Sequence, residues 1–101
     1  MPPFFDQHQS SIEEVCGRFG VKRLEAFGSV LRSDFSPGSD VDFLVQFDGS
    51  FPDAFESYFG LKEGLESIVA RPVDLVVVDA IKNPVFRAEV MQTKVPIYVA
   101  A

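Results

Sequence analysis

The sequence lacks the features of a secreted or membrane protein. None of its apolar runs approaches the roughly 18 residues that a membrane-spanning helix needs. The N-terminus has no basic stretch followed by an apolar segment, as a secretion signal would have. The chain has one cysteine, Cys16, so no disulfide can form within it. We therefore expect a cytoplasmic protein in a reducing compartment, with no membrane partner.

Positive charge is also scarce. Nine basic side chains against 15 acidic ones give a net charge of −6, and no basic run is longer than Lys22-Arg23. Long DNA or RNA would be repelled over most of such a surface, so we expect no extended nucleic-acid footprint. A nucleotide that arrives with its own Mg²⁺ is compatible with this charge.

The composition is that of a folded globular protein, with 47% apolar and 24% charged residues. A chain of 101 residues predicts one domain with a single core. Residues 1–9 show no periodicity, and we expect them to be a flexible lead-in to a domain over residues 10–101. The only histidine, His8, has no neighbour at ligand spacing, so we interpret it as a solvated residue.

One helix and two strands are predicted in the first half of the chain. Ser11 and Glu14 form a capping-box pattern, and the apolar helical stripe that follows, which includes Cys16 as a buried residue, ends before a strand over residues 21–27. A helical turn and an irregular turn then lead to a second strand over residues 40–47. This second strand alternates between an apolar face for the core and an acidic face.

The second half predicts two more helices and two more strands. A helix over residues 51–70 has apolar residues on more than one stripe, which indicates either a wide core-facing helix or a partner-docking surface. The apolar segment 73–78 predicts a central or near-central strand. A helix capped by Asn83-Pro84 and an edge strand over 95–99 complete the order. The fold class is therefore α/β (α+β), with a small mixed sheet backed by helices.

Two aspartates, Asp40 and Asp42, flank one valine at the start of the second strand. Their side chains share one face because strand side chains alternate, and paired carboxylates are suited to a divalent cation. The Gly28-Ser29 pair closes the first strand, where glycine allows close approach and a helix start offers N–H groups to phosphate. Cations on oxygen ligands beside an anion-binding turn are what nucleotidyl transfer requires.

Gly28-Ser29, ten residues and then Asp40-x-Asp42 resemble the signature of the nucleotidyltransferase superfamily typified by DNA polymerase beta. The short length resembles the minimal nucleotidyltransferase branch, which includes the antitoxin partners of HEPN-domain toxins. The resemblance runs from about residue 21 to the C-terminus, and it implies a polymerase-beta-like nucleotidyltransferase fold.

The resemblance implies transfer of a nucleoside monophosphate, with ATP as donor, to an acceptor hydroxyl. Asp40 and Asp42 would hold one Mg²⁺ and, together with Asp74, a second Mg²⁺. Asp74 is an ionisable residue in an apolar strand, which indicates a cation or polar cleft, and it would orient or take the acceptor proton. The alternative is a capped or ion-paired aspartate. Gly28 and Ser29 would bind the β- and γ-phosphates.

Other polar residues have weaker assignments. Arg32 matches an arginine often found three positions after the family's serine, and it either contacts phosphate or pairs with Asp34. Ser39 fits the family's nucleotide-binding pattern as a turn residue. Val30 stands where many minimal members carry arginine, which lowers the expected phosphate affinity. Three further aspartates at turns or helix starts are interpreted as structural: Asp48, Asp53 and Asp79.

The favoured function is an antitoxin that adenylylates a HEPN-type partner on a tyrosine hydroxyl. One alternative is a non-catalytic antitoxin module that binds its partner through the phenylalanine-rich helix. Another is an aminoglycoside-type or RNA-end nucleotidyltransferase, which needs an acceptor pocket or a basic groove. We expect the acceptor to be held at the interface of a homo-oligomer or to be brought by a second protein.

Overall fold

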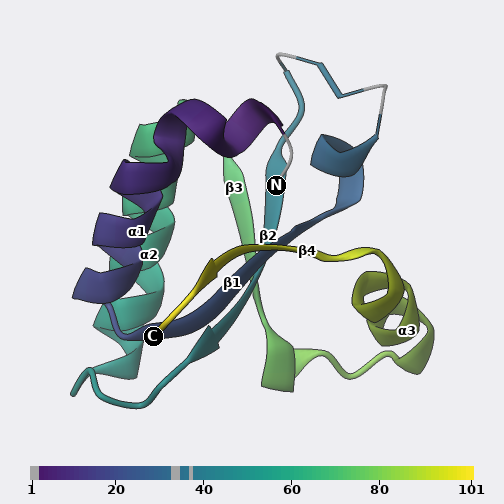
Figure 1. Ribbon diagram of the computed structural model, residues 1–101. Helices are drawn as coiled ribbons and strands as arrows, with labels where there is room; N and C mark the ends of the chain where they lie inside the picture. The colour runs from purple at the N-terminus through teal and green to yellow at the C-terminus, as the bar shows by residue number, and fades with distance from the viewer. Residues whose placement is uncertain (1–2, 33–34, 37) are drawn as a thin grey trace.

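The structure, a computed structural model, describes residues 3–32, 35–36 and 38–101. In this part of the chain four strands form one sheet in the order β3-β2-β1-β4 (Figure 1). Strand β1 is antiparallel to β2 and to β4, whereas β2 and β3 are parallel. The mixed α/β fold expected from the sequence is confirmed. The strands are β1 Val21–Phe27, β2 Val41–Phe47, β3 Val73–Val77 and β4 Val95–Val99.

Helices cover both faces of the sheet. Figure 1 shows α1 (Gln9–Arg18) and α2 (Ala54–Val69) on one side and α3 (Pro84–Thr93) on the other. The main core lies under α1 and α2, and a smaller apolar cluster lies under α3. Among the described residues, no helix combines the length and the apolarity that a membrane crossing requires.

The alternation of β2 determines which face carries the site. Val41, Phe43 and Val45 are fully buried in the main core. Leu44, from the opposite face, belongs to the cluster that includes Val90 of α3. Side chains at even positions of β2, including the predicted acidic residue at position 42, therefore point toward the α3 side of the sheet.

Residues Pro3–His8 pack onto the core, whereas the sequence led us to expect a flexible lead-in over residues 1–9. Residues Pro3–His8 form a 3-10 helix, and Phe5 is fully buried with its ring 5.7 Å from that of Phe43. Helix α1 continues directly from this segment at Gln9, and no side chain caps it. The predicted capping box therefore does not form, because Ser11 lies inside the helix and not at its start.

Strand β3 lies at an edge of the sheet, and the prediction of a central or near-central position was wrong. Within the described chain only β2 pairs with it. Its apolar residues are covered by helices on its two faces. Leu75 is buried on the α2 side, where the Tyr58 hydroxyl donates to its carbonyl oxygen at 2.6 Å, and Val76 packs in the α3 cluster. The apolar run thus reflects burial on both faces, not two neighbouring strands.

Several local predictions are confirmed. Strand β4 is an edge strand that contains Pro96, and the Asn83 side chain caps α3. The Asp53 side chain caps α2, which begins at Ala54, three residues later than the predicted start at position 51. Cys16 is fully buried, and burial raises its pKa to about 12, so it is a neutral thiol at physiological pH.

Candidate nucleotide-binding and catalytic site

Two of the predicted acidic residues lie side by side on neighbouring strands. In the parallel register of β2 and β3, Asp42 pairs with Asp74, and Phe27 of β1 lies opposite Asp42 on its other side. Directly paired residues point to the same face of a sheet, so both carboxylates lie on the α3 side. Asp42 is half-buried, and Asp74 is exposed at the sheet edge.

Asp40, Asp42 and Asp74 form one electrostatic group. Asp40 is an exposed residue immediately before β2. The pKa of Asp42 is raised, first by burial, then by the negative charge of Asp74 and then by that of Asp40. The positive charge of Arg32 and the Ser29 backbone N–H, which donates to the Asp42 carboxylate, lower it. Like-charge repulsion of this kind is what a bound cation would remove.

The donor set fits Mg²⁺ in type and charge. Mg²⁺ prefers carboxylate oxygens and usually takes one or two of them together with substrate phosphates and water. In the described part of the chain, however, no three His, Cys, Asp or Glu side chains are arranged to hold a metal ion by themselves. A cation at this site would therefore need ligands from the substrate as well as from Asp40 and Asp42.

Gly28 allows the turn after β1 to lie against Asp42. Its φ of +76° is in the region that favours glycine, and a Cβ at this position would overlap the Asp42 carboxylate oxygen. The turn continues as a 3-10 helix, Gly28–Leu31, which Phe27 precedes as N-cap without a side-chain cap. The Ser29 hydroxyl donates to the Asp40 carbonyl oxygen at 3.3 Å. The glycine-serine turn and the acidic pair are thus one connected unit.

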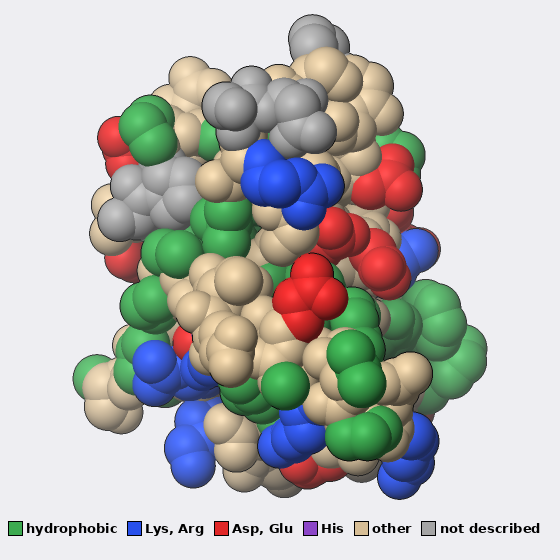
Figure 2. All heavy atoms as spheres, turned by 90° about the vertical axis from the view of Figure 1, so that its right-hand side faces the viewer, with side chains coloured by type: hydrophobic (Ala, Val, Ile, Leu, Met, Phe, Trp, Pro, Cys, Tyr) green, Lys and Arg blue, Asp and Glu red, His purple; other side chains and the backbone are tan. Residues whose placement is uncertain are grey.

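A cavity of about 970 Å³ opens beside this unit. Six of the seven predicted site residues line it: Gly28, Ser29, Arg32, Ser39, Asp40 and Asp42. The seventh, Asp74, is not part of the lining and lies at the exposed edge formed by β3. Figure 2 looks onto the α3 side of the molecule and shows acidic side chains gathered near the middle of this face, with basic side-chain atoms next to them.

Helix α3 forms a wall of the cavity that was not predicted from the sequence. Phe86, Glu89 and Thr93 line the cavity together with Val90. These positions follow a helical repeat of three, one and three residues, which places them on one face of α3. That spacing was available in the sequence, but only the fold shows that this face is opposite the glycine-serine turn.

The loop before Asp40 is held by Arg71, which was also not predicted. The Arg71 guanidinium donates to the carbonyl oxygens of Ser36 at 2.7 Å and Ser39 at 3.4 Å. It also lies over the rings of Phe35 and Phe4, at 4.3 and 4.9 Å from their centroids. Arg71 therefore connects the N-terminal 3-10 helix to the loop that carries Ser39. Arg32 is exposed on the cavity wall, and its predicted alternative partner Asp34 lies outside the described residues.

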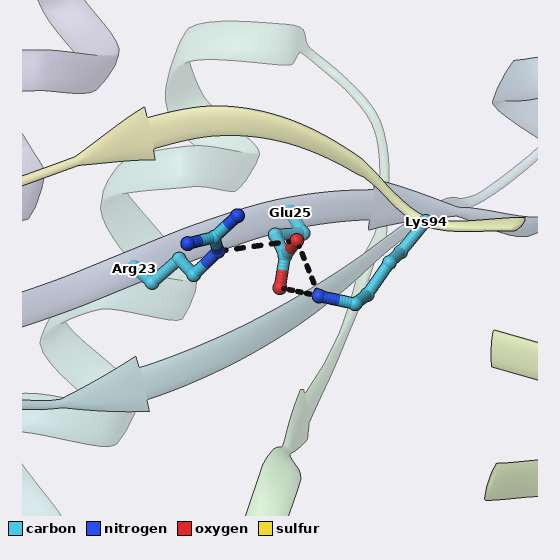
Figure 3. Close-up of polar contacts among 3 residues, drawn as sticks. All are labelled: Arg23, Glu25 and Lys94. Atoms are coloured by element: carbon cyan, nitrogen blue, oxygen red, sulfur yellow. Dashed lines mark hydrogen bonds and ion pairs between the residues drawn. The ribbon is translucent and has the colours of Figure 1, made fainter. Parts of the chain in front are cut away.

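A buried carboxylate fixes the C-terminal end of α3 to the sheet (Figure 3). Glu25 of β1 is only 4% exposed, and Lys94 Nζ, in the residue directly after α3, donates to its two carboxylate oxygens at 2.9 and 2.7 Å. Arg23 Nε completes the cluster at 3.2 Å from Glu25 Oε2. Since Asn83 caps the other end of α3, both ends of the cavity wall are held by polar contacts.

The fold and the cavity define a small α/β domain with an acidic site of nucleotide size. Residues 9–97 match the family model described as the nucleotidyltransferase domain. The chain therefore belongs to the nucleotidyltransferase domain family, as an enzyme of the minimal branch.

Individual relatives agree with this assignment. The chain is 37% identical over 71 residues to the protein adenylyltransferase MntA of Thermococcus cleftensis, and the match covers 70% of each protein. It is 33% identical over 84 residues to a protein of Methanocaldococcus jannaschii that is provisionally named a protein adenylyltransferase, covering 83% of this chain and 81% of the relative.

Solved structures share the fold. One that is provisionally described as a minimal nucleotidyltransferase superposes with a TM-score of 0.74 at 29% identity and covers 89% of both chains. A toxin-antitoxin structure with AMP-PNP superposes with a TM-score of 0.69 at 19% identity, covering 91% of this chain and 73% of that one. The resemblance inferred from the glycine-serine and aspartate motifs is confirmed at the level of the family.

Proposed function

We propose that this nucleotidyltransferase transfers AMP from ATP, with Mg²⁺, to a hydroxyl group of a HEPN-type toxin and thereby acts as an antitoxin. The observation that carries the proposal is the contact between the glycine-serine turn and the acidic pair at one wall of the cavity. Two relatives at 33% and 37% identity bear the name protein adenylyltransferase, one of them provisionally. A structure with the same fold is described as a toxin-antitoxin with AMP-PNP, which supports the nucleotide and the class of partner.

Each of the site residues would have a separate role in binding the metal ions or the phosphates. Bound Mg²⁺ would neutralise phosphate charge and lower the pKa of the acceptor hydroxyl. Asp40 and Asp42 would hold the ion that accompanies the triphosphate, and Asp74 would join them in holding a second ion. Ser29 would exchange its long hydrogen bond to the Asp40 carbonyl for a stronger, charge-assisted bond to phosphate. Arg32, whose charge already acts on Asp42, would contribute a positive group to the same phosphates.

Asp74 would act on the acceptor. The acceptor oxygen forms a bond to the α-phosphorus of ATP, the bond from that phosphorus to pyrophosphate breaks, and the hydroxyl proton passes to the Asp74 carboxylate. Asp74 is suited to this step because it is exposed at the sheet edge beside Asp42, where a hydroxyl on a protein surface can reach it. The nucleotide would occupy the cavity, and the acceptor would approach from the open edge formed by β3.

The proposal is tested by incubating the protein with α-labelled ATP, Mg²⁺ and the purified product of the neighbouring gene. Label should move to that product, and Asp42→Asn should reduce the rate by at least about 100-fold, because the variant loses a carboxylate that holds the cation. Absence of transfer by the wild type, or an unchanged rate in Asp42→Asn, would contradict the proposal.

A second candidate function is partner binding without turnover. It is favoured by an aromatic patch on α2, where Phe55 and Phe59 are 70% and 44% exposed with ring centroids 4.6 Å apart. The double variant Asp40→Asn/Asp42→Asn separates the two candidates. A module that only binds would keep full neutralisation of the toxin in cells, whereas an enzyme would lose it while still co-purifying with its partner.

A further inference from the structure

We propose that the cavity face of α3 is the nucleoside half of the donor site, with the ring of Phe86 stacking on the base and Glu89 and Thr93 contacting its polar edge. This inference rests on the proposed function, since it assigns the part of ATP that the glycine-serine turn and the aspartates do not bind. Four observations carry it: the exposure of Phe86, the anchoring of α3, the charge of the wall and the hydrogen-bonding capacity of the wall.

Phe86 presents a partly exposed aromatic ring to the cavity. Its side chain is 39% exposed at the cavity, and its ring packs edge-on against that of Phe27, with centroids 6.0 Å apart and planes at 72°. Phe27 directly precedes Gly28, so the stacking surface adjoins the turn assigned to the phosphates. A nucleoside lying on Phe86 would therefore be continuous with a triphosphate at Gly28.

The backbone of α3 is rigidly placed, as a specific subsite requires. The Asn83 side chain accepts from the N–H groups of Val85 and Phe86 at 2.9 and 3.2 Å. Val90 is buried in the cluster under the helix, and Lys94 is bonded to Glu25 at the other end. Phe86 thus has a fixed backbone and a partly exposed ring, a combination that favours stacking at low entropic cost.

The groups assigned to the phosphates and the α3 residues belong to different segments of the cavity lining. Gly28, Ser29 and Arg32 suit a triphosphate, and Asp40 and Asp42 beside them would hold the Mg²⁺ that accompanies it. Glu89 on the α3 wall repels phosphate but not an uncharged base. The cavity of about 970 Å³ is at the upper end of the range for small-molecule sites, roughly 300–1,000 Å³, so both halves of a nucleotide can be accommodated.

The wall accepts hydrogen bonds and has few donors to offer. The Glu89 carboxylate offers its two oxygens as hydrogen-bond acceptors. The Thr93 hydroxyl already donates to the Glu89 carbonyl oxygen at 2.9 Å, so its lone pairs are what it can present to a ligand. Two acceptors favour adenine, whose amino group carries two N–H donors, over uracil, whose single N3–H donor lies between two carbonyl oxygens that the acceptors would repel.

The test compares ATP with inorganic triphosphate by calorimetric titration in Mg²⁺, using the full chain without its partner. Phe86→Ala should weaken ATP binding about tenfold, as expected for the loss of one base–aromatic stack, and leave triphosphate binding unchanged. The matched control is Val85→Ala, on the same helix turn but 75% exposed and outside the cavity lining, which should change ATP binding by less than about twofold. Equal ATP affinity in wild type and Phe86→Ala, or an equal loss for ATP and triphosphate, would overturn the subsite.

A second titration tests the polar edge. The wild type should prefer ATP over UTP, and Glu89→Gln should reduce that preference because glutamine can also donate to a uracil carbonyl. An unchanged preference would overturn the role of Glu89. If ATP binding depends on Phe86 but the wild type transfers no label, the subsite stands and the proposed transfer fails. If label is transferred while Phe86→Ala leaves ATP binding unchanged and raises only the KM for the acceptor, the transfer stands and the α3 wall serves the acceptor instead.

Discussion

Gly28 lets the turn after β1 lie against Asp42 because glycine has no side chain. Replacement by alanine would place a Cβ on the Asp42 carboxylate oxygen and impose strain at a φ of +76°. We expect Gly28→Ala to lower the free energy of unfolding by about 1–2 kcal/mol and to reduce transfer by at least about 100-fold, because Asp42 must move. Thermal unfolding and a labelled-ATP assay measure the two effects.

The control for this prediction is Gly17→Ala. Gly17 is an exposed helical glycine with open space where an alanine Cβ would lie, so alanine there should stabilise the protein by about 0.5–1 kcal/mol and leave transfer unchanged. If the two variants had the same free energy of unfolding and the same transfer rate, the close approach of Gly28 to Asp42 would not matter for function.

Asp42 makes stability depend on pH in an unusual direction for an aspartate. Its pKa is raised in the folded protein, by burial, Asp74 and Asp40 in that order, so the folded state binds the proton more tightly than the unfolded state does. The contribution of Asp42 to the free energy of unfolding is largest below the ordinary pKa of an aspartate. It is lost as the pH rises through the raised pKa of the folded state. Asp42→Asn should therefore be more stable than the wild type at pH 7, by less than about 1 kcal/mol after solvent screening.

The measurement is urea unfolding of both proteins in EDTA at pH 7 and near pH 3. The stability gain of Asp42→Asn should shrink toward zero at the lower pH, where Asp42 is protonated in both states. A gain that is the same at both pH values would show that repulsion among the three aspartates is not its cause.

At the scale of the elements, α3 depends on the cluster of Glu25, Lys94 and Arg23. Lys94→Ala would leave the buried Glu25 carboxylate with Arg23 as its remaining cation, and we expect a loss of about 2–4 kcal/mol in the free energy of unfolding. Lys62→Ala, which breaks a 3.9 Å pair with Glu66 on the surface of α2, should cost less than about 0.5 kcal/mol. Urea unfolding measures both losses. Equal losses in the two variants would contradict a special role of the buried cluster in holding α3.

The loop before β2 depends on Arg71, which we interpret as a positioning residue. Arg71→Met removes the hydrogen bonds to Ser36 and Ser39 and the charge over Phe4 and Phe35. We expect the KM for ATP to rise about tenfold while kcat changes by less than about threefold, because the nucleotide half of the site loosens and the chemistry does not change. Arg71→Lys should recover only part of the affinity, since lysine lacks the planar fork. If Arg71→Met folds and its KM for ATP is unchanged, Arg71 stabilises the fold but does not position the nucleotide site.

The sequence predicted the helices and strands better than it predicted which of them pack together. The alternation around Asp42 and the Asn83-Pro84 cap are local signals, and the one strand and one helix that they indicate are present. The edge position of β3 could not be predicted, because an apolar strand looks the same whether strands or helices cover it. Phe5 was missed for a similar reason, since a short aromatic segment without periodicity gives no sign of the ring that it meets at Phe43.

The same limit applies to the site. The glycine-serine turn and the aspartate pair are close in sequence and carry a recognisable spacing, so the six cavity-lining residues among the seven predicted could be named in advance. The contributions of Phe86, Glu89 and Arg71 come from segments that begin 29 residues or more after Asp42, the last residue of that motif. Their roles depend on the packing of α3 and of the turn between α2 and β3, which no local pattern specifies.

At the scale of the whole molecule, the cavity couples distant parts of the chain. Its lining comes from the end of β1, the 3-10 turn, the loop before β2, β2 itself and α3. A ligand that contacts all of these segments binds the folded state alone, and it should therefore stabilise the entire domain. At about 100 times its dissociation constant, ATP with Mg²⁺ should add about 2.7 kcal/mol, which raises the Tm of a domain of this size by about 13 °C.

The controls for this last prediction separate the nucleotide from the metal. In EDTA the ATP shift should fall to a small fraction of its value, because the triphosphate would then meet Asp40 and Asp42 without a neutralising cation. In the double variant Asp40→Asn/Asp42→Asn the dependence on Mg²⁺ should disappear, since amides hold Mg²⁺ poorly, while Phe86→Ala should reduce the shift and keep its dependence on Mg²⁺. A shift of equal size in EDTA would mean that ATP binds this fold without the aspartates and the cation, and the division of the cavity into a metal-bound phosphate half and a nucleoside half would have to be abandoned.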